Sequence, residues 1–359
     1  MDNLTSLDIY ALLEEIRPRL IDAKVEAIQH IDNEIVLRLF KGCKFDLLIS
    51  SGIGLWISDY KREAPKTPDN FCMLLRKDLK GERLTSVTQH MFDRVVEFGF
   101  SNGMKLIAEF FAKGNIILCD ADYTIIHALM FKEFGSRSIK PKATYLFPRA
   151  GKDPVAMTQA EFSAHLKAGE KDIVRTLVMD FNIAGHYAEF AIGLAGIDKG
   201  SLCKDLSPKG TALLFDGIKA VLSDAAKRPA PNISADGLVL PLLLPAHVSS
   251  QTFDSFNSAI DSFFANKPPK EERSKRSEKV LRTIEKQESL ILELEQEALR
   301  EKEVGDLISA NAGEIDDIIR TIRSAKKKHS IDEIREIISK SPYSKKIVEI
   351  SHDKLVLEL

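Results

Sequence analysis

Apolar residues near the start of the chain recur every three or four positions, as they do along one face of a helix. The apolar residues of this run are Ile9, Leu12, Leu13, Ile16 and Leu20. Thr5 or Ser6 precedes the run and can cap the helix. Pro18 predicts a break or kink near its end. The pattern therefore predicts a helix over the first twenty residues.

The hydrophobic period then changes to two, which is typical of strands. The expected strands are residues 27–30, 34–40, 44–50, 54–58, 83–90, 93–100, 104–110, 115–119 and 124–130. A second helical pattern covers 68–80, and Asn102-Gly103 indicates a tight hairpin turn. We expect an α+β fold class for the chain, with a mostly antiparallel β domain over residues 1–155.

Helical spacing resumes at Thr158 and defines a second expected domain, residues 156–266. Inside it, two short apolar helices flank Asn182-Ile183-Ala184-Gly185. This pattern predicts a helix-hairpin-helix, whose backbone N–H groups can point at a phosphate. Alanine, at Ala184, replaces the second glycine that such hairpins commonly carry, so an ordinary helical turn with Gly185 as a C-cap glycine remains an equal alternative.

Residues 267–306 combine a charged, proline-containing linker with a long helix that has a coiled-coil seam. No second strand of the coiled coil follows, so we expect the sequence to be a fragment. Residues 307–359 are expected to be the start of a small α/β middle domain. It would end on a strand at 353–359 with no obvious partner strand.

Composition and charge narrow the possible functions. The chain has 359 residues, 44% of them hydrophobic, which is enough for two to three domains. Its four cysteines are scattered, which favours reduced thiols over a zinc or redox site. The start lacks a basic signal region, and the apolar run 238–244 is too short to cross a membrane. We expect a cytoplasmic protein with no membrane partner.

The net charge of −2 argues at first against a nucleic-acid partner, but the charge is unevenly distributed. Residues 320–346 are strongly basic, and Lys326, Lys327 and Lys328 end an expected helix. These lysines are either a solvated helix end, which suits the helix dipole, or a contact to phosphates of RNA. Sequence alone leaves both open.

No catalytic constellation is present: the chain has no phosphate-binding loop, nucleophile elbow or metal-binding histidine motif. We therefore expect no catalytic residue, metal or cofactor.

Two polar features remain, Asp8 in the first helical turn and the segment from Gln89 to Arg94. Asp93 and Arg94 would point to opposite faces of a strand unless a bulge redirects them to one surface. There, Arg94 could bind phosphate and Asp93 the donor groups of RNA. In the alternative interpretation, Asp93 and Arg94 form a structural ion pair, and Asp8 is an acid that caps the first helix.

At these residues the chain resembles the NFACT family, which includes NEMF, RqcH and proteins labelled fibronectin-binding protein A. The matching motifs are Ser6-Leu7-Asp8, Pro65-x-x-Pro68-x-x-Phe71, Gln89-x-x-x-Asp93-Arg94-Val95-Val96, Lys113-Gly114-Asn115-Ile116-Ile117-Leu118, Phe256-Asn257-x-Ala259-x-Asp261 and Ala310-Asn311. The resemblance implies an N-terminal domain similar to that of the formamidopyrimidine-DNA glycosylases. A helix-hairpin-helix domain, a coiled-coil arm and the middle domain would follow it.

The resemblance also implies a function. The family acts in ribosome-associated quality control: it binds obstructed large ribosomal subunits that carry peptidyl-tRNA and recruits tRNA for template-free C-terminal tailing, while the ribosome makes the peptide bonds. Asp8, Asp93 and Arg94 match its tRNA-engaging positions. Implied partners are tRNA, the rRNA of the large subunit, and a ubiquitin ligase or other rescue factor. Gly185 and the lysines 326–328 are further candidates for contacts to phosphate or rRNA.

The alternative function is a nucleic-acid-processing enzyme of DNA-glycosylase ancestry. The sequence argues against it, because the chain lacks the N-terminal proline nucleophile and the zinc-finger cysteines of those enzymes. An adhesion function, which an old family label suggests, is the weakest alternative.

Overall fold

The structure of the chain, a computed structural model, describes residues 3–63, 65–133, 137–149, 151–265, 287, 301–302, 304–342, 344, 346–351 and 354–358. The chain divides into two compact units, Met1–Pro268 and Pro269–Leu359. Each unit has its own cluster of buried apolar side chains.

The first unit begins with helix α1 (Ser6–Leu20), which confirms the helix that the apolar spacing predicts. Thr5 is the N-cap: its hydroxyl accepts a hydrogen bond from the Asp8 N–H, and the Asp8 carboxylate accepts one from the Thr5 N–H. This capping box supplies partners to two backbone N–H groups at the helix start. Pro18 lies in the last turn, and the helix ends at Leu20.

Two antiparallel sheets form the β part of this unit, and in each sheet the strands pair in chain order. The first sheet consists of β1 (Lys24–Ile31), β2 (Glu34–Lys41), β3 (Cys43–Ser50) and β4 (Gly54–Ser58). The second consists of β5 (Leu84–Gln89), β6 (Val95–Phe100), β7 (Lys105–Glu109), β8 (Asn115–Cys119) and β9 (Ile125–Ala128). Helix α2 (Asn70–Leu79) connects them and packs on β1. The predicted antiparallel β region is confirmed, with strand ends that differ by a few residues.

The two sheets approach each other where the β3–β4 turn crosses the β7–β8 turn. Gly52 and Gly114 both have positive φ, at 75° and 65°. A Cβ at Gly114 would lie 2.0 Å from the Gly52 nitrogen, so only glycine fits at this crossing. The glycine-rich segment around Gly52 is therefore a structural turn.

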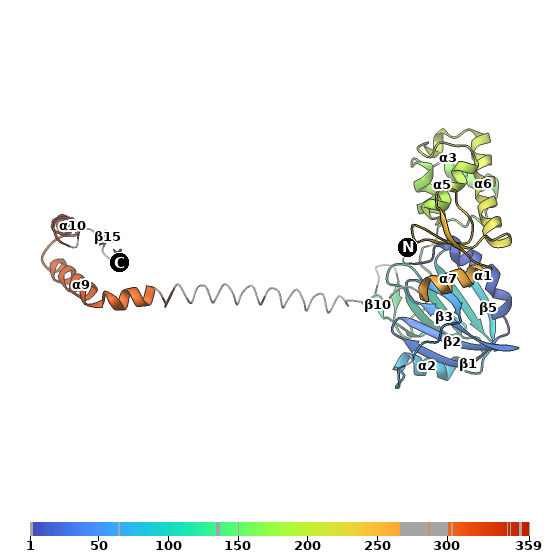
Figure 1. Cartoon of the computed structure of the whole chain (residues 1–359), viewed down its shortest axis with the longest axis horizontal. Coiled ribbons are helices and arrows are strands. Elements are labelled where there is room, and N and C mark those ends of the chain that lie inside the picture. The colour runs from blue at the N-terminus through green and yellow to red at the C-terminus, as the bar shows by residue number, and fades with distance from the viewer. Residues whose placement is uncertain are drawn as a thin grey trace. The chain divides into compact units, whose positions relative to one another are not determined.

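The helical part of the first unit follows a short hairpin that the sequence pattern does not reveal, β10 (Lys132–Glu133) and β11 (Ser138–Ile139). Its elements are α3 (Gln159–Lys167), α4 (Ile173–Phe181), α5 (Gly185–Leu194), the 3-10 turn η1 (Cys203–Asp205) and α6 (Pro208–Lys227). In Figure 1 these helices, drawn in green and yellow, form one end of the unit and the strands form the other. One apolar cluster extends through both parts, and α6 packs against α1. A domain boundary at residue 155 stays a prediction.

After α6 the chain forms a small sheet of order β13-β12-β14 and returns to the β part as α7 (Phe256–Ala265). Its strands are β12 (Asn232–Ser234), β13 (Val239–Leu240) and β14 (Ser249–Thr252). Strands this short show no alternation of apolar and polar residues, so the sequence pattern does not reveal all three. Helix α7 packs against both α1 and β4.

The second unit contains α9 (Ala312–Lys326), α10 (Ile331–Ser339), β15 (Ile347–Ile350) and β16 (Leu355–Leu357). Its core consists of Ile318, Ile322, Ile334 and Ile350. The strand expected at the chain end does have a partner, because β16 pairs with β15, so the expectation of an unpaired strand is wrong. The expected coiled-coil helix lies almost entirely outside the described residues.

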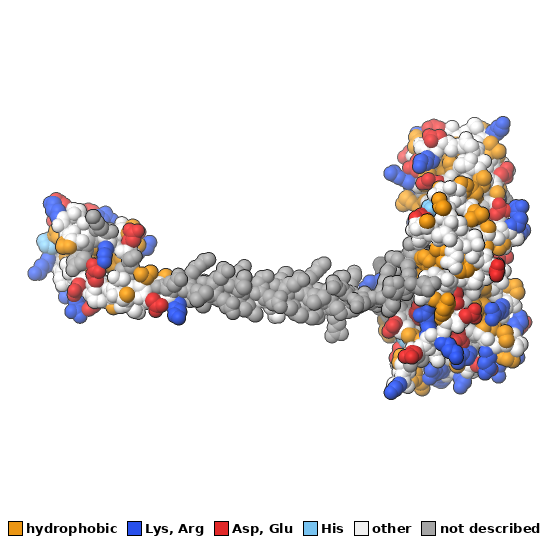
Figure 2. All heavy atoms as spheres, viewed as in Figure 1, with side chains coloured by type: hydrophobic (Ala, Val, Ile, Leu, Met, Phe, Trp, Pro, Cys, Tyr) orange, Lys and Arg blue, Asp and Glu red, His pale blue; other side chains and the backbone are white. Residues whose placement is uncertain are grey.

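On the face of the first unit in view in Figure 2, Lys and Arg side chains gather over the lower part, where Figure 1 places β1, β2 and α2. Charge is thus uneven within this unit as well as along the sequence.

Candidate nucleic-acid interface

Asp8, the first residue expected to engage tRNA, lies inside the molecule, with 0% of its surface exposed. Its Oδ1 accepts a hydrogen bond from the Tyr187 hydroxyl at 2.5 Å, and its Oδ2 accepts one from the Thr5 N–H at 2.8 Å. Tyr187 belongs to α5, so Asp8 joins the start of α1 to the helical part. The structure shows Asp8 as a helix-capping acid, which was one of its two alternatives, and its part in tRNA binding stays a prediction.

Burial controls the protonation of this pair. It raises the pKa of the Asp8 carboxyl above the ordinary value of 3.8, while the hydrogen bonds from Tyr187 and Thr5 act in the opposite direction. Burial and the neighbouring Asp8 carboxylate raise the pKa of Tyr187 well above 10.0. The tyrosine therefore keeps its proton and acts as the donor to Asp8.

The polar segment that follows Gln89 is the tip of the β5–β6 hairpin. Met91 and Phe92 adopt left-handed φ values of 46° and 53°, which turns the chain back without a strand bulge. The Gln89 side-chain amide donates to the Ser6 carbonyl and to the Asp93 carbonyl, both at 2.9 Å. These bonds fix the hairpin tip against the start of α1.

Asp93 and Arg94 are both half-buried at this tip. The Asp93 carboxylate accepts a hydrogen bond from the Arg94 backbone N–H at 2.7 Å, and so stabilises the turn. Among the described residues, no acidic side chain forms an ion pair with the Arg94 guanidinium. A structural Asp93–Arg94 ion pair is therefore not what holds these residues in place.

Arg94 lines a cavity of about 230 Å³ together with the start of α1 and the turn between α4 and α5. The lining residues are Asn3, Thr5, Ser6, Arg94, Val178, Asn182, Ile183 and Ala184. Segments that lie far apart in the sequence thus meet here, and the cavity contains one guanidinium and no acidic side chain. Its electrostatics favour an anionic ligand.

The turn beside the cavity leaves hydrogen-bond donors available. Asn182 ends α4 in a left-handed conformation, and its buried Nδ2 has no hydrogen-bond partner among the described residues. Ala184 is the N-cap of α5 and provides no side-chain cap, so the first backbone N–H groups of α5 lack that partner. Gly185 follows, and a Cβ there would contact nothing within 4 Å. An uncapped helix start with open space beside it suits a phosphate.

The remaining predicted residues, Lys326, Lys327 and Lys328, lie in the second unit, at the end of α9 and in the turn after it. All three are exposed, which agrees with both alternatives for them. Lys326 donates a hydrogen bond to the Ser351 carbonyl at 3.1 Å.

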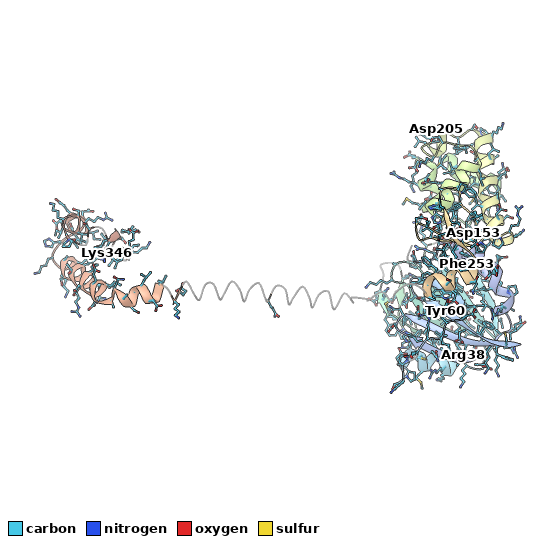
Figure 3. All side chains as sticks on the ribbon, in the orientation of Figure 1. Arg38, Tyr60, Asp153, Asp205, Phe253 and Lys346 are labelled. Carbon is cyan, nitrogen blue, oxygen red and sulfur yellow. The ribbon has the colours of Figure 1, made fainter. Side chains whose placement is uncertain are left out.

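A larger cavity of about 570 Å³ lies along α3, and none of the predicted site residues lines it. It is bordered by Asp153, which Figure 3 places where the helical part meets the strands. Its residues include both acids and bases, so its charge gives no preference for an anion.

The sequence analysis missed two residues of the site, Asn182 as a donor and Tyr187 as the partner of Asp8. Asn182 carried a signal, because asparagine before a short turn commonly takes the left-handed conformation. Tyr187 carried none, since 179 residues separate it from Asp8.

Among the described residues, no three metal-binding side chains cluster to form a metal site. Over the same residues, no helix combines the length and the apolar character that a membrane span requires.

Comparison with known proteins identifies relatives along most of the chain. The archaeal Rqc2 homolog aRqcH of Methanocaldococcus jannaschii is 31% identical over 93% of this chain and 54% of its own length. The human ribosome quality control complex subunit NEMF is 27% identical over 89% of this chain and 34% of its own length. The chain thus spans about half of the archaeal relative and a third of the human one.

Among solved structures, the N-terminal part of the fibronectin/fibrinogen-binding protein of Streptococcus suis has the same fold. It matches 74% of this chain and 100% of its own, with a TM-score of 0.61 and 22% identity. The family described as NFACT N-terminal and middle domains matches residues 5–355. The chain therefore belongs to the NFACT family, as its motifs suggested.

Proposed function

We propose that this chain is an RNA-binding adaptor of ribosome quality control. In this function it binds obstructed large ribosomal subunits that hold peptidyl-tRNA and recruits tRNA for template-free C-terminal tailing in the cytoplasm. The ribosome performs the peptide-bond chemistry, so the chain needs no catalytic residue of its own. The family membership and the relatives named as ribosome quality control subunits support this function.

The observation that carries the proposal is the cavity at Arg94. A guanidinium free of acidic partners among the described residues and the uncapped start of α5 line the same space. The first supplies a planar donor fork and the second supplies backbone donors, a combination that suits an RNA phosphate and an unpaired nucleotide. In this proposal α4, the turn and α5 act as the helix-hairpin-helix, with Gly185 beside the phosphate.

The three tRNA-engaging positions have different roles in this proposal. Arg94 contacts the RNA. Asp93 holds the hairpin tip through the Arg94 N–H. Asp8 is a positioning residue, because its buried contact to Tyr187 fixes α5 relative to α1. Lys326–Lys328 serve as a separate, sequence-independent contact to rRNA.

The test compares Arg94→Ala with the unchanged chain. We expect the affinity for a fluorescently labelled mixture of deacylated tRNAs to fall about tenfold or more, as loss of a specific arginine contact does. The thermal midpoint should remain nearly unchanged, because no acidic partner is lost. Gly185→Ala should also weaken binding without loss of stability, because the added Cβ meets open space inside the protein and occupies the space beside the helix start.

The matched control is Arg175→Ala, which removes the same side chain at the opposite end of α4 from the cavity. Arg175 is largely exposed and pairs with Asp172. Equal tRNA affinity for Arg94→Ala and the unchanged chain would refute the cavity as the binding site. An equal loss of tRNA affinity in the Arg175→Ala control would show that the effect comes from the change in net charge and not from a contact in the cavity.

A further inference from the structure

A second basic surface lies at the C-terminal end of α1, away from the cavity at Arg94. We call it the α1-end surface and define it by the exposed residues Arg19, Lys24, Lys41 and Arg83. The sheet brings three of them together: Lys24 forms a β-bridge with Arg83 and pairs with Phe40, which precedes Lys41. The Arg19 guanidinium lies 4.5 Å from the centre of the Phe45 ring, near the tip of the β2–β3 hairpin that also carries Lys41.

Two other cations near this surface are paired with acids, but these four are not. Arg17 pairs with Glu14, Lys44 pairs with Glu26, and both acids are thereby occupied. The acids closest in the sequence are Asp22, which is exposed, and Glu82, which accepts a hydrogen bond from the Ser101 hydroxyl. Among the described residues, no ion pair joins an acid to any residue of the α1-end surface. The surface therefore keeps a local excess of positive charge.

Helix capping explains part of this cluster. The Lys41 ammonium donates to the carbonyls of Pro18 and Ile21 at the end of α1, and Arg83 donates to the Asp22 carbonyl. Cations at a helix C-terminus are favourable there. Among the described residues Lys24 has no such contact, and in Figure 2 basic side chains gather over the part of the unit where Figure 1 places β1, β2 and α2. A cap needs one cation, so the remaining positive charge is available to a ligand.

The two basic sites stand at opposite ends of one rigid element. Thr5 and Ser6 at the start of α1 line the Arg94 cavity, and Arg19 lies in its last turn. A helix of 15 residues is roughly 20 Å long at ~1.5 Å per residue. A small cavity suits an unpaired nucleotide, whereas exposed lysines and arginines suit the regular phosphates of a duplex. A tRNA offers both within one molecule.

We propose that the α1-end surface binds the phosphate backbone of a double-stranded arm of the same tRNA whose unpaired segment occupies the Arg94 cavity. This inference rests on the proposed function. The two contacts act together: the cavity selects the RNA, and the α1-end surface adds affinity that does not depend on sequence.

The test is the double variant Arg19→Gln/Lys24→Gln, which removes two charges and leaves the capping contacts of Lys41 and Arg83 intact. We expect affinity for deacylated tRNA to fall about tenfold at low salt. The slope of log affinity against log salt should become shallower by roughly 1.4 to 1.8, the contribution of two phosphate contacts. The matched control is Lys204→Gln/Lys209→Gln, two exposed lysines of the helical part, close to Asp205, which Figure 3 places at its far end.

A single-stranded RNA of the same length as the tRNA is the second ligand in this experiment. The double variant should bind it nearly as the unchanged chain does, because the α1-end surface reads a duplex. Unchanged tRNA affinity and salt slope would overturn the inference while the Arg94→Ala result still stands. The inference would also be overturned if the double variant still bound tRNA but no longer co-sedimented with large ribosomal subunits. The α1-end surface would then bind rRNA. If the unchanged chain binds no tRNA, the proposed function fails first.

Discussion

At the scale of single residues, Asp8 shows how a charged side chain can serve a binding site without touching the ligand. Its two carboxylate oxygens are both used inside the protein, by the Tyr187 hydroxyl and the Thr5 N–H. An acid in this position cannot read RNA donors, but it can determine where α5 and its uncapped start lie relative to Arg94.

The substitution Asp8→Asn tests this role. The amide keeps one acceptor oxygen and replaces the other with a donor, which faces the donor groups of Tyr187 or Thr5. We expect the free energy of unfolding to fall by about 1–3 kcal/mol, the cost of leaving a buried polar group without a partner. Urea unfolding measures it, with Tyr187→Phe as the companion variant. Non-additive losses in the double variant are expected because the two residues share a contact.

The same pair predicts a pH dependence. Because burial raises the pKa of Asp8 above 3.8, the folded state takes up this proton at a higher pH than the unfolded chain. The stability contributed by Asp8 therefore rises as pH falls through the raised pKa, and Asp8→Asn lacks this gain. The deficit of the variant should grow as the pH falls from neutral toward 3.8, the ordinary pKa of the carboxyl. A deficit that shrinks over this range would contradict the direction of the shift.

Some of these roles of single residues could be predicted from the sequence. The capping role of Asp8 was one of two alternatives, because an acid in the first helical turn has an ordinary use there. Its burial was not predictable, since the cover comes from α5 and depends on how the helical part packs against α1. Arg94 could be named as a candidate from the sequence, but the turn that presents it needs Met91 and Phe92 in left-handed conformations, which a sequence seldom reveals.

At the scale of elements, α7 returns from the helical part and becomes a structural piece of the β part. Its Asn257 side chain acts as a substitute for a neighbouring strand: it accepts from the Ile57 N–H at 2.7 Å and donates to the Ile57 carbonyl at 2.8 Å. Asp261 accepts from the Trp56 indole N–H at 3.0 Å and from the Asp59 N–H at 2.9 Å. The exposed edge of β4 is thereby covered.

The substitution Asp261→Ala should therefore be strongly destabilising. It leaves the buried indole N–H of Trp56 without an acceptor, and we expect a loss of about 2–4 kcal/mol in the free energy of unfolding. Trp56 is the single tryptophan of the chain, so its fluorescence in a urea titration reports the change directly. Asp254→Ala is the matched control, because that side chain is exposed. Equal midpoints for the two variants would show that α7 contributes nothing to the β part.

These contacts explain a motif that sequence could find but not interpret. Phe256, Asn257, Ala259 and Asp261 stood out as a group, yet their partners lie about two hundred positions earlier. The antiparallel strands were predictable because each pairs with its neighbour in the chain, and local turn residues set that pairing. Long-range contacts such as Trp56–Asp261 leave no periodic trace.

At the scale of the whole molecule, the net charge of −2 averages over regions of different character. The α1-end surface and the lysines at the end of α9 and in the turn after it are positive, while many acids are occupied by caps and ion pairs, as Glu14 and Glu26 are. The net charge of the chain therefore does not exclude an RNA partner, although composition alone first argued against one.

The division into two units leads to the last prediction, that the first unit folds without the second. Its apolar cluster extends from Leu4 to Ile260, and the separate cluster of the second unit extends from Ile318 to Ile350. A fragment of residues 1–268 should therefore unfold within about 3 °C of the corresponding transition of the whole chain, since a coupling of 1 kcal/mol shifts a unit of this size by roughly 2–4 °C. Calorimetry of both proteins measures the shift.

The same fragment separates the two RNA contacts of the proposed function. It contains Arg94 and the α1-end surface, so its tRNA affinity should match that of the whole chain and remain sensitive to Arg94→Ala. It lacks Lys326–Lys328, so its co-sedimentation with large ribosomal subunits should weaken. A lower midpoint together with lost tRNA binding would mean that the second unit supports the fold of the first, and the independent-unit prediction would then be wrong.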